Sequence, residues 1–93
     1  MAMKTETVWA AIDSLLDYAK DCELLHPLDE TFARNSILAE LGLDSYEKEE
    51  ERHSFPECLN LLCDYAAENG QIHDTIAERD LFDTKIMNCL VPR

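Results

Sequence analysis

Apolar residues recur at spacings of three and four in four segments of the chain, which is the period of an α-helix. The first segment runs from about Thr5 to Glu23, with Trp9 and Leu16 widening its apolar face, and the second begins near Asp29. The other two open at Ser54 and Thr75. The expected core faces are Val8, Ile12, Leu15, Ala19 and Cys22; Phe32, Ala33, Ile37, Leu38 and Leu41; Phe55, Leu59, Leu62, Ala66 and Asn69; and Leu81, Phe82, Ile86, Met87 and Leu90.

Residues that favour helix ends stand at the boundaries of these segments. Asp29 is expected to cap the second helix through its carboxylate, and residues 54–57 and 75–78 have the capping-box pattern. Gly42 and Gly70 are expected to end helices, because glycine adopts the left-handed C′ conformation without a Cβ penalty. The chain outside the helices is expected to begin with a frayed segment, Met1 to Lys4, and Pro92 is expected to stop the last helix.

The segments from Leu15 to Leu41 and from Leu62 to Leu90 are two copies of one pattern. Asp17-Tyr18-Ala19 aligns with Asp64-Tyr65-Ala66, and Leu25-His26 aligns with Ile72-His73. Each copy predicts a helical hairpin, and one hairpin can bury its apolar stripe against the other. We therefore predict an all-α domain, a small four-helix bundle. Its parts are a hairpin over residues 5–42, an acidic linker over 43–53 and a second hairpin over 54–91.

The chain is short and strongly acidic. Its 93 residues form one small domain, with 20 acidic and 8 basic side chains and a formal net charge of -12. Nucleic-acid binding and binding to anionic membranes both require basic surfaces, so neither partner is expected. The acidic linker is expected to be a solvated connector, and a docking site for a basic partner is the alternative.

The four cysteines, Cys22, Cys58, Cys63 and Cys89, form no C-x-x-C motif and are expected to be reduced, buried thiols. Cys58 and Cys63 are five residues apart on one predicted helix, which points them in different directions and argues against a shared metal ion. No apolar run approaches the roughly 20 residues that span a bilayer, and no leader opens the sequence. We therefore expect a cytoplasmic location and no membrane partner.

Three histidines and two tyrosines are the remaining candidates for chemistry. His26 and His73 occupy matching turns, where a histidine commonly bonds nearby backbone, and no second ligand stands at metal spacing. His53 is expected at the surface. Tyr18 and Tyr65 are expected to pack at the edge of the core. From the residues, no catalytic, cofactor-binding or metal-binding position is assigned.

The amino-acid sequence of the last helix resembles that of a known family. IHDTIAERDLFDTKIMNCLVPR, and above all ERDLFDTKIM from Glu78 to Met87 with the following Pro92-Arg93, resembles the N-terminal region of bacterial, Firmicutes-type galactose-1-phosphate uridylyltransferases. The first copy, from Asp17 to Glu47, agrees with the opening pattern of that family. The resemblance covers about Val8 to Arg93, which is only the first fifth or so of a family member.

The resemblance implies a parent enzyme that moves a uridylyl group from UDP-glucose to galactose 1-phosphate through a uridylyl-histidine intermediate. In that family the nucleophilic histidine lies in a His-rich motif far downstream of the position of Arg93, so no catalytic residue carries over to this sequence. The chain is then expected to be a non-catalytic N-terminal domain that packs on the remainder of the enzyme or on a second subunit, and that meets both sugar substrates only through the parent. The alternative is a free-standing acidic helical module that binds other proteins.

Overall fold

The computed structural model describes residues 3–90, and this part of the chain is all-α with no strand. The predicted fold class is confirmed, and the helix ends lie within one turn of the predicted ones. The expectations for Met1, Ala2 and Pro92 fall outside the described residues. The elements are α1 (Thr5–Asp21), the 3-10 turn η1 (Pro27–Asp29), α2 (Glu30–Leu41), α3 (Phe55–Glu68) and α4 (Ile76–Leu90).

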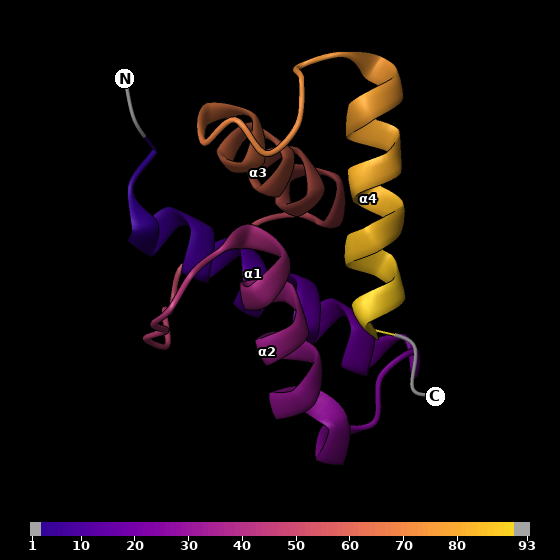
Figure 1. The fold of residues 1–93 in the computed structure, drawn as a ribbon. Helices are drawn as coiled ribbons and strands as arrows, with labels where there is room; N and C mark the ends of the chain where they lie inside the picture. The colour runs from indigo at the N-terminus through magenta and orange to yellow at the C-terminus, as the bar shows by residue number, and fades with distance from the viewer. Residues whose placement is uncertain (1–2, 91–93) are drawn as a thin grey trace.

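The two hairpins pack together through equivalent helices. α1 has its most extensive packing against α3, and α2 packs chiefly against α4. In Figure 1, α1 crosses the middle of the molecule between α3 and α2, and α4 stands upright along one side. The principal extents of 34 × 26 × 24 Å are those of a compact globule rather than of a long bundle of parallel helices. Each hairpin thus buries its stripe against its copy, as the repeat predicts.

α1 is the centre of the core. Val8, Ile12, Leu15, Leu16 and Ala19 have no exposed surface, because α1 is covered by helices of both hairpins. The remaining elements each contribute a narrower face to the same cluster. These contributions are Leu25 from the first turn; Ala33, Ile37, Leu38 and Leu41 from α2; Cys58, Leu62, Cys63 and Ala66 from α3; and Phe82, Ile86 and Leu90 from α4.

Two large apolar residues predicted on core faces are exposed instead. Phe32 in α2 is 72% exposed and Leu81 in α4 is 62% exposed. The two positions match in the repeat, and in each case the next residue, Ala33 or Phe82, is buried. Adjacent helical positions point about 100° apart, and at these two places the neighbouring helices cover the second residue of each pair and leave the first exposed.

The core face of α3 is rotated from the predicted one. Asn69 is exposed, whereas Cys58 and Cys63 are fully buried beside Leu62. Phe55 and Leu59 are half-buried at the edge of the cluster, as is Met87 in α4. Cys22 is exposed, because α1 ends at Asp21 and Cys22 already belongs to the turn. The cysteine positions therefore show that α3 faces α1 with a side that the predicted stripe only partly covers.

The first helices of the two hairpins end in the same way. Glu23 and Gly70 match in the repeat, and both adopt left-handed backbone conformations, with φ of 62° and 73°. The N–H of the following residue reaches back to Ala19 O or Ala66 O at 2.9 Å. Gly42 ends α2 with φ of 71°. Asp29 makes no side-chain cap, contrary to the prediction, because η1 precedes α2 and supplies its first turn.

Replacing Glu23 by glycine is expected to stabilise the protein by about 0.5–1 kcal/mol. A residue with a Cβ pays about 1–2 kcal/mol in the left-handed region, and the larger entropy of glycine in the unfolded chain offsets part of that gain. Urea denaturation measures the change. The matched control is Gly70→Ala, where an added Cβ meets no atom within 4 Å, so the expected loss of about 1 kcal/mol reflects the backbone alone. A destabilised Glu23→Gly variant would contradict this account.

Candidate functional site

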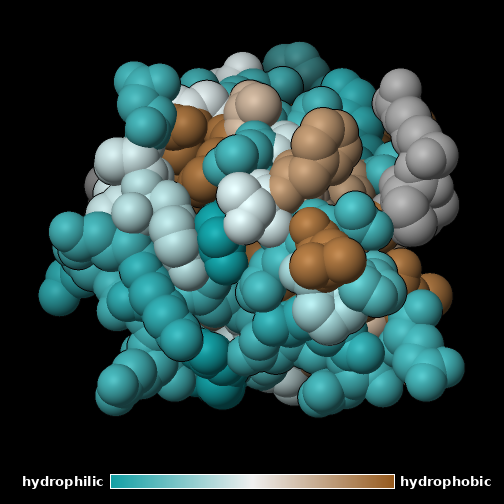
Figure 2. Space-filling model, turned by 90° about the horizontal axis from the view of Figure 1, so that it is seen from below, coloured by the Kyte–Doolittle hydropathy of each residue, from teal (hydrophilic) through white to brown (hydrophobic). Residues whose placement is uncertain are grey.

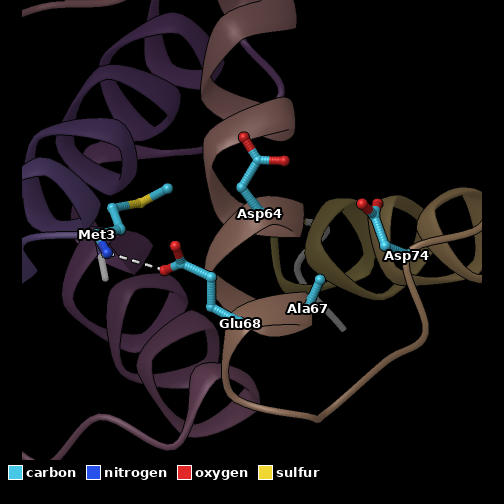
Figure 3. A pocket seen from close by; sticks show the side chains of 5 residues that line it. All are labelled: Met3, Asp64, Ala67, Glu68 and Asp74. Carbon is cyan, nitrogen blue, oxygen red and sulfur yellow. Dashed lines mark hydrogen bonds between the residues drawn. The ribbon is translucent and has the colours of Figure 1, made fainter. Parts of the chain in front are cut away.

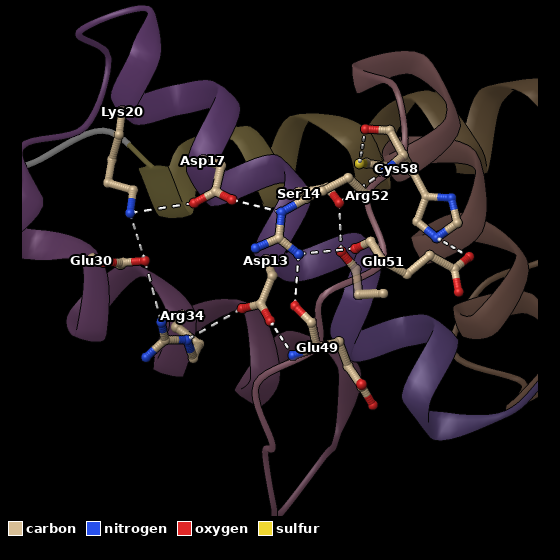
Figure 4. Close-up of polar contacts among 12 residues, drawn as sticks. Asp13, Ser14, Asp17, Lys20, Glu30, Arg34, Glu49, Glu51, Arg52 and Cys58 are labelled. Atoms are coloured by element: carbon tan, nitrogen blue, oxygen red, sulfur yellow. Dashed lines mark hydrogen bonds and ion pairs between the residues drawn. The ribbon is translucent and has the colours of Figure 1, made fainter.

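The largest polar cluster joins α1 to the connector, residues 43–53 (Figure 4). Asp13 lies on α1 and is only 5% exposed. Its Oδ1 accepts a hydrogen bond from the Tyr46 hydroxyl, and its Oδ2 accepts one from the Glu49 N–H at 2.9 Å. The sequence predicted a solvated connector. Instead, the buried carboxylate of Asp13 holds the backbone of the connector against α1.

Further contacts fix the connector along α1. The Trp9 indole donates to Ser45 O at 3.0 Å, and the His53 N–H donates to Ser14 Oγ at 3.0 Å. The Arg52 guanidinium donates to Asp17 Oδ2 at 2.8 Å, and Figure 4 shows this exposed ion pair. These contacts span the whole connector, from its start to its end.

Arg34 connects this cluster to α2. Its guanidinium lies over the Tyr46 ring, 4.4 Å from the centroid, and its Nε is 4.0 Å from Asp13 Oδ1. Its Nη2 donates to Glu30 Oε2 at 3.3 Å, and Lys20 donates to the same oxygen at 3.0 Å. The cluster thus ties α1, α2 and the connector together through charged hydrogen bonds.

The Tyr46 hydroxyl is a hydrogen-bond donor in this cluster. Burial, followed by the hydrogen bond to Asp13, raises the pKa of Tyr46 to about 12. A phenol with that pKa holds its proton at neutral pH and serves as a hydrogen-bond donor to a fixed carboxylate. Both carboxylate oxygens of Asp13 thus accept hydrogen bonds from protein donors, whereas Arg34 Nε is buried without a hydrogen-bond partner. Sequence reasoning did not identify the cluster, although Asp13-Ser14 interrupts an apolar run.

The histidines are placed apart from one another. His26 Nδ1 accepts from the Leu28 N–H at 3.0 Å, the backbone contact expected for a turn histidine. His53 is more buried than predicted, and its ring lies between Glu51 and Glu57 at 3.2 and 2.7 Å. His73 uses its backbone N–H to donate to Glu78 at 3.4 Å. Among residues 3–90, no three histidine, cysteine or acidic side chains form a metal-binding group.

The tyrosines matched by the repeat have the edge positions that the sequence predicts. Tyr18 is 42% exposed, and its ring packs on Phe55 with the centroids 4.5 Å apart. Tyr65 is half-buried against the core cluster. The Tyr18 and Phe55 rings therefore pack at the edge of the core where α1 meets α3.

The two buried thiols are protected from reaction. Burial raises the pKa of Cys58 to about 11 and that of Cys63 to about 12. The Cys63 thiol also donates to Asp83 Oδ1 at 3.0 Å, which favours the protonated form. All four cysteines are free, as predicted, although Cys22 is exposed and Cys89 is half-buried. A thiol that keeps its proton at neutral pH is a poor nucleophile.

The free energy of unfolding is expected to fall as pH rises from about 9 to about 12. The raised pKa values of Cys58, Cys63 and Tyr46 mean that the fold favours their protonated forms. This contribution is complete below the ordinary values of 9.0 for the thiols and 10.0 for the phenol, and is lost as pH approaches the folded values. Urea denaturation across this range measures it. Cys63→Ala should show a shallower decline, and an unchanged slope would contradict the assignment.

Figure 3 shows a surface depression with a volume of about 400 Å³. Its lining is Met3, Asp64, Ala67, Glu68 and Asp74, and three of these residues are acidic. The Met3 N–H donates to Glu68 at 2.9 Å, the bond drawn in Figure 3. Acidic walls oppose the binding of a sugar phosphate. The hollow therefore has the wrong charge for such a substrate.

Three exposed apolar side chains lie in the turn of the first hairpin and at the start of α2. Leu24, Leu28 and Phe32 are 48%, 87% and 72% exposed, and we call them the hairpin-tip surface. Figure 2 looks at the molecule from below, the side on which α2 begins, and shows separate apolar side chains among hydrophilic ones. No described helix is both long enough and apolar enough to cross a bilayer.

Comparison with known proteins confirms the resemblance over most of the chain. The galactose-1-phosphate uridylyltransferase of Clostridium acetobutylicum is 39% identical over 85 residues, which are 88% of this chain and 17% of that protein. The enzymes of the same name from Fusobacterium nucleatum and Halalkalibacterium halodurans are each 36% identical, over 86% and 96% of this chain and 16% and 18% of their own lengths. No protein-family model matches the chain, and no solved structure matches it significantly. The chain thus spans about a sixth of the length of these relatives.

Proposed function

We propose that this chain is a helical, non-catalytic N-terminal domain of a galactose-1-phosphate uridylyltransferase. The observation that carries the proposal is the asymmetry of the matches, which cover 88% of this chain and 17% of the Clostridium relative. The parent would transfer uridylyl from UDP-glucose to galactose 1-phosphate in the cytoplasm, through a uridylyl-histidine on the part of the enzyme outside this chain. The domain would support that part rather than carry out the chemistry.

The electrostatics and geometry support this division of labour. A net charge of -12 opposes the binding of two phosphate-bearing sugars. The strongest polar cluster, around Asp13 and Tyr46, holds the connector to α1. The three histidines lie in separate turns and contact backbone or carboxylates. What the described residues provide is a folded unit with an exposed apolar tip, which suits packing against another part of a protein.

The test combines the intact mass of the native gene product with an assay of uridylyl transfer. We expect a product several times heavier than the 10.7 kDa of this chain. The full product should convert UDP-glucose and galactose 1-phosphate, and residues 1–93 alone should convert neither. Turnover by the purified 93-residue chain would refute the non-catalytic role. A native product of 10.7 kDa would refute the proposal that this chain is part of a longer enzyme.

A free-standing module for protein binding is the second candidate. The exposure of Leu28 and Phe32 favours it, because large apolar side chains grouped on a surface are typical of interaction sites. The two candidates differ in the same mass measurement. A small native product that captures no uridylyltransferase would favour the module.

A further inference from the structure

The hairpin-tip surface is formed by consecutive turns of one hairpin. Leu24 follows the left-handed residue that ends α1, Leu28 lies in η1 and Phe32 lies in the first turn of α2. Leu28 and Phe32 lie in successive elements, η1 and the start of α2, and both side chains are mostly exposed. The opposite side of α2 is already buried, since Ala33 and Ile37 are 1% and 0% exposed. The surface is therefore separate from the core of this chain.

Tyr18, which is 42% exposed, packs its ring on Phe55, and the remaining large apolar residues that are exposed in the described part of the chain lie on α4. Ile76 and Leu81 on α4 are 83% and 62% exposed. They are five residues apart, and at 100° per residue their side chains point about 140° from each other. A single flat partner surface cannot cover both. This contrast selects the first hairpin rather than the second as the docking side.

The rim of the hairpin-tip surface is acidic. Asp21, Glu23 and Asp29 stand between or beside the three apolar residues. The nearest cations on these helices, Lys20 and Arg34, are both held by Glu30. A partner that covers the tip would therefore present an apolar centre and a rim of lysine or arginine.

We propose that the hairpin-tip surface is where this domain docks on the rest of the uridylyltransferase, against an apolar patch rimmed with basic residues. This inference rests on the proposed function. The occupant follows from the lengths of the relatives, because about five-sixths of each protein lies outside the segment that this chain matches. That remainder is covalently attached and so is present at a high effective concentration, which makes even a modest apolar contact sufficient.

Hydroxyl-radical footprinting with mass spectrometry tests the proposal on unmodified protein. The oxidation rates of Leu28 and Phe32 are compared between the full product of the native gene and residues 1–93, whose helical fold is checked by circular dichroism. We expect at least a fivefold slower oxidation of both residues in the full product. Ile76, which has a similar exposure to Leu28, serves as the internal control and should change by less than about twofold.

The possible results separate this inference from the proposed function. If the native product is no longer than 93 residues, the proposed function fails and the inference fails with it. If a longer enzyme exists and Leu28 and Phe32 oxidise as fast as in the short chain, only the docking surface is wrong. If the short chain protects these residues in proportion to its own concentration, the occupant is a second copy, which also overturns the proposal.

Paired variants provide a second readout in the full product. Leu28→Asp with Phe32→Asp is expected to increase the rate of proteolytic release of the domain at least tenfold. Ile76→Asp with Leu81→Asp is the matched control, with the same chemistry on the other exposed apolar residues. Both pairs should leave the circular dichroism of the short chain unchanged, since all four side chains are mostly exposed. Equal release by the two pairs would overturn the assignment of the docking side.

Discussion

Replacing Phe82 by alanine is expected to lower the free energy of unfolding by about 3–5 kcal/mol. Phe82 is 4% exposed, and α4 packs through this face on α2 and α3. Removing the ring loses its burial and leaves a cavity that helices from both hairpins border. Proteins of this size are stable by only about 5–15 kcal/mol, so much of the stability should disappear. Equilibrium unfolding in urea, monitored by circular dichroism, measures the change.

The neighbouring residue supplies the control for that experiment. Leu81→Ala removes an apolar side chain that is 62% exposed, so the expected change is within about 0.5 kcal/mol. Both positions were predicted on the core face, and only the structure separates them. A loss below about 1 kcal/mol for Phe82→Ala, or similar losses for the two variants, would show that α4 faces the core with another side.

Replacing Asp13 by alanine is expected to cost about 3 kcal/mol of stability. The substitution leaves the Tyr46 hydroxyl and the Glu49 N–H without their acceptor. It also removes one of the two carboxylates beside the half-buried guanidinium of Arg34, the other being Glu30. A buried donor that loses a charged acceptor lowers the stability by its full desolvation free energy. Water cannot readily take the place of the lost carboxylate, because Asp13 is only 5% exposed. Urea denaturation again gives the magnitude.

Two further variants distinguish the buried contact from ordinary surface charge. Asp17→Ala removes another α1 carboxylate that binds the connector, through Arg52, but this pair is exposed and should contribute less than about 1 kcal/mol. Tyr46→Phe removes one hydroxyl and should cost about 1–2 kcal/mol. In a double-mutant cycle, Asp13→Ala and Tyr46→Phe should be less than additive. Full additivity would mean that the two side chains do not interact.

The helices and their grouping into two hairpins followed from local pattern. Spacings of three and four, capping boxes at 54–57 and 75–78, and glycines at 42 and 70 are local signals, and the structure has a helix end at each. The repeat predicted the hairpins, because two copies of one incomplete apolar face stabilise each other. The end of α1 at Glu23 shows the limit of local rules, since a residue other than glycine adopts the left-handed conformation there.

Hydrophobic periodicity, charge and sequence motifs are properties of the chain alone. They were enough to predict an acidic, all-helical domain of two repeated hairpins and its resemblance to galactose-1-phosphate uridylyltransferases. They did not predict that Ala33 and Phe82 are buried while Phe32 and Leu81 are exposed. An apolar stripe wider than the contact leaves open which edge the neighbouring helix covers, and the packing of the helices settles it. The binding of the connector by Asp13 likewise depends on the folded arrangement, because it joins residues 33 and 36 positions apart, a distance that no local pattern encodes.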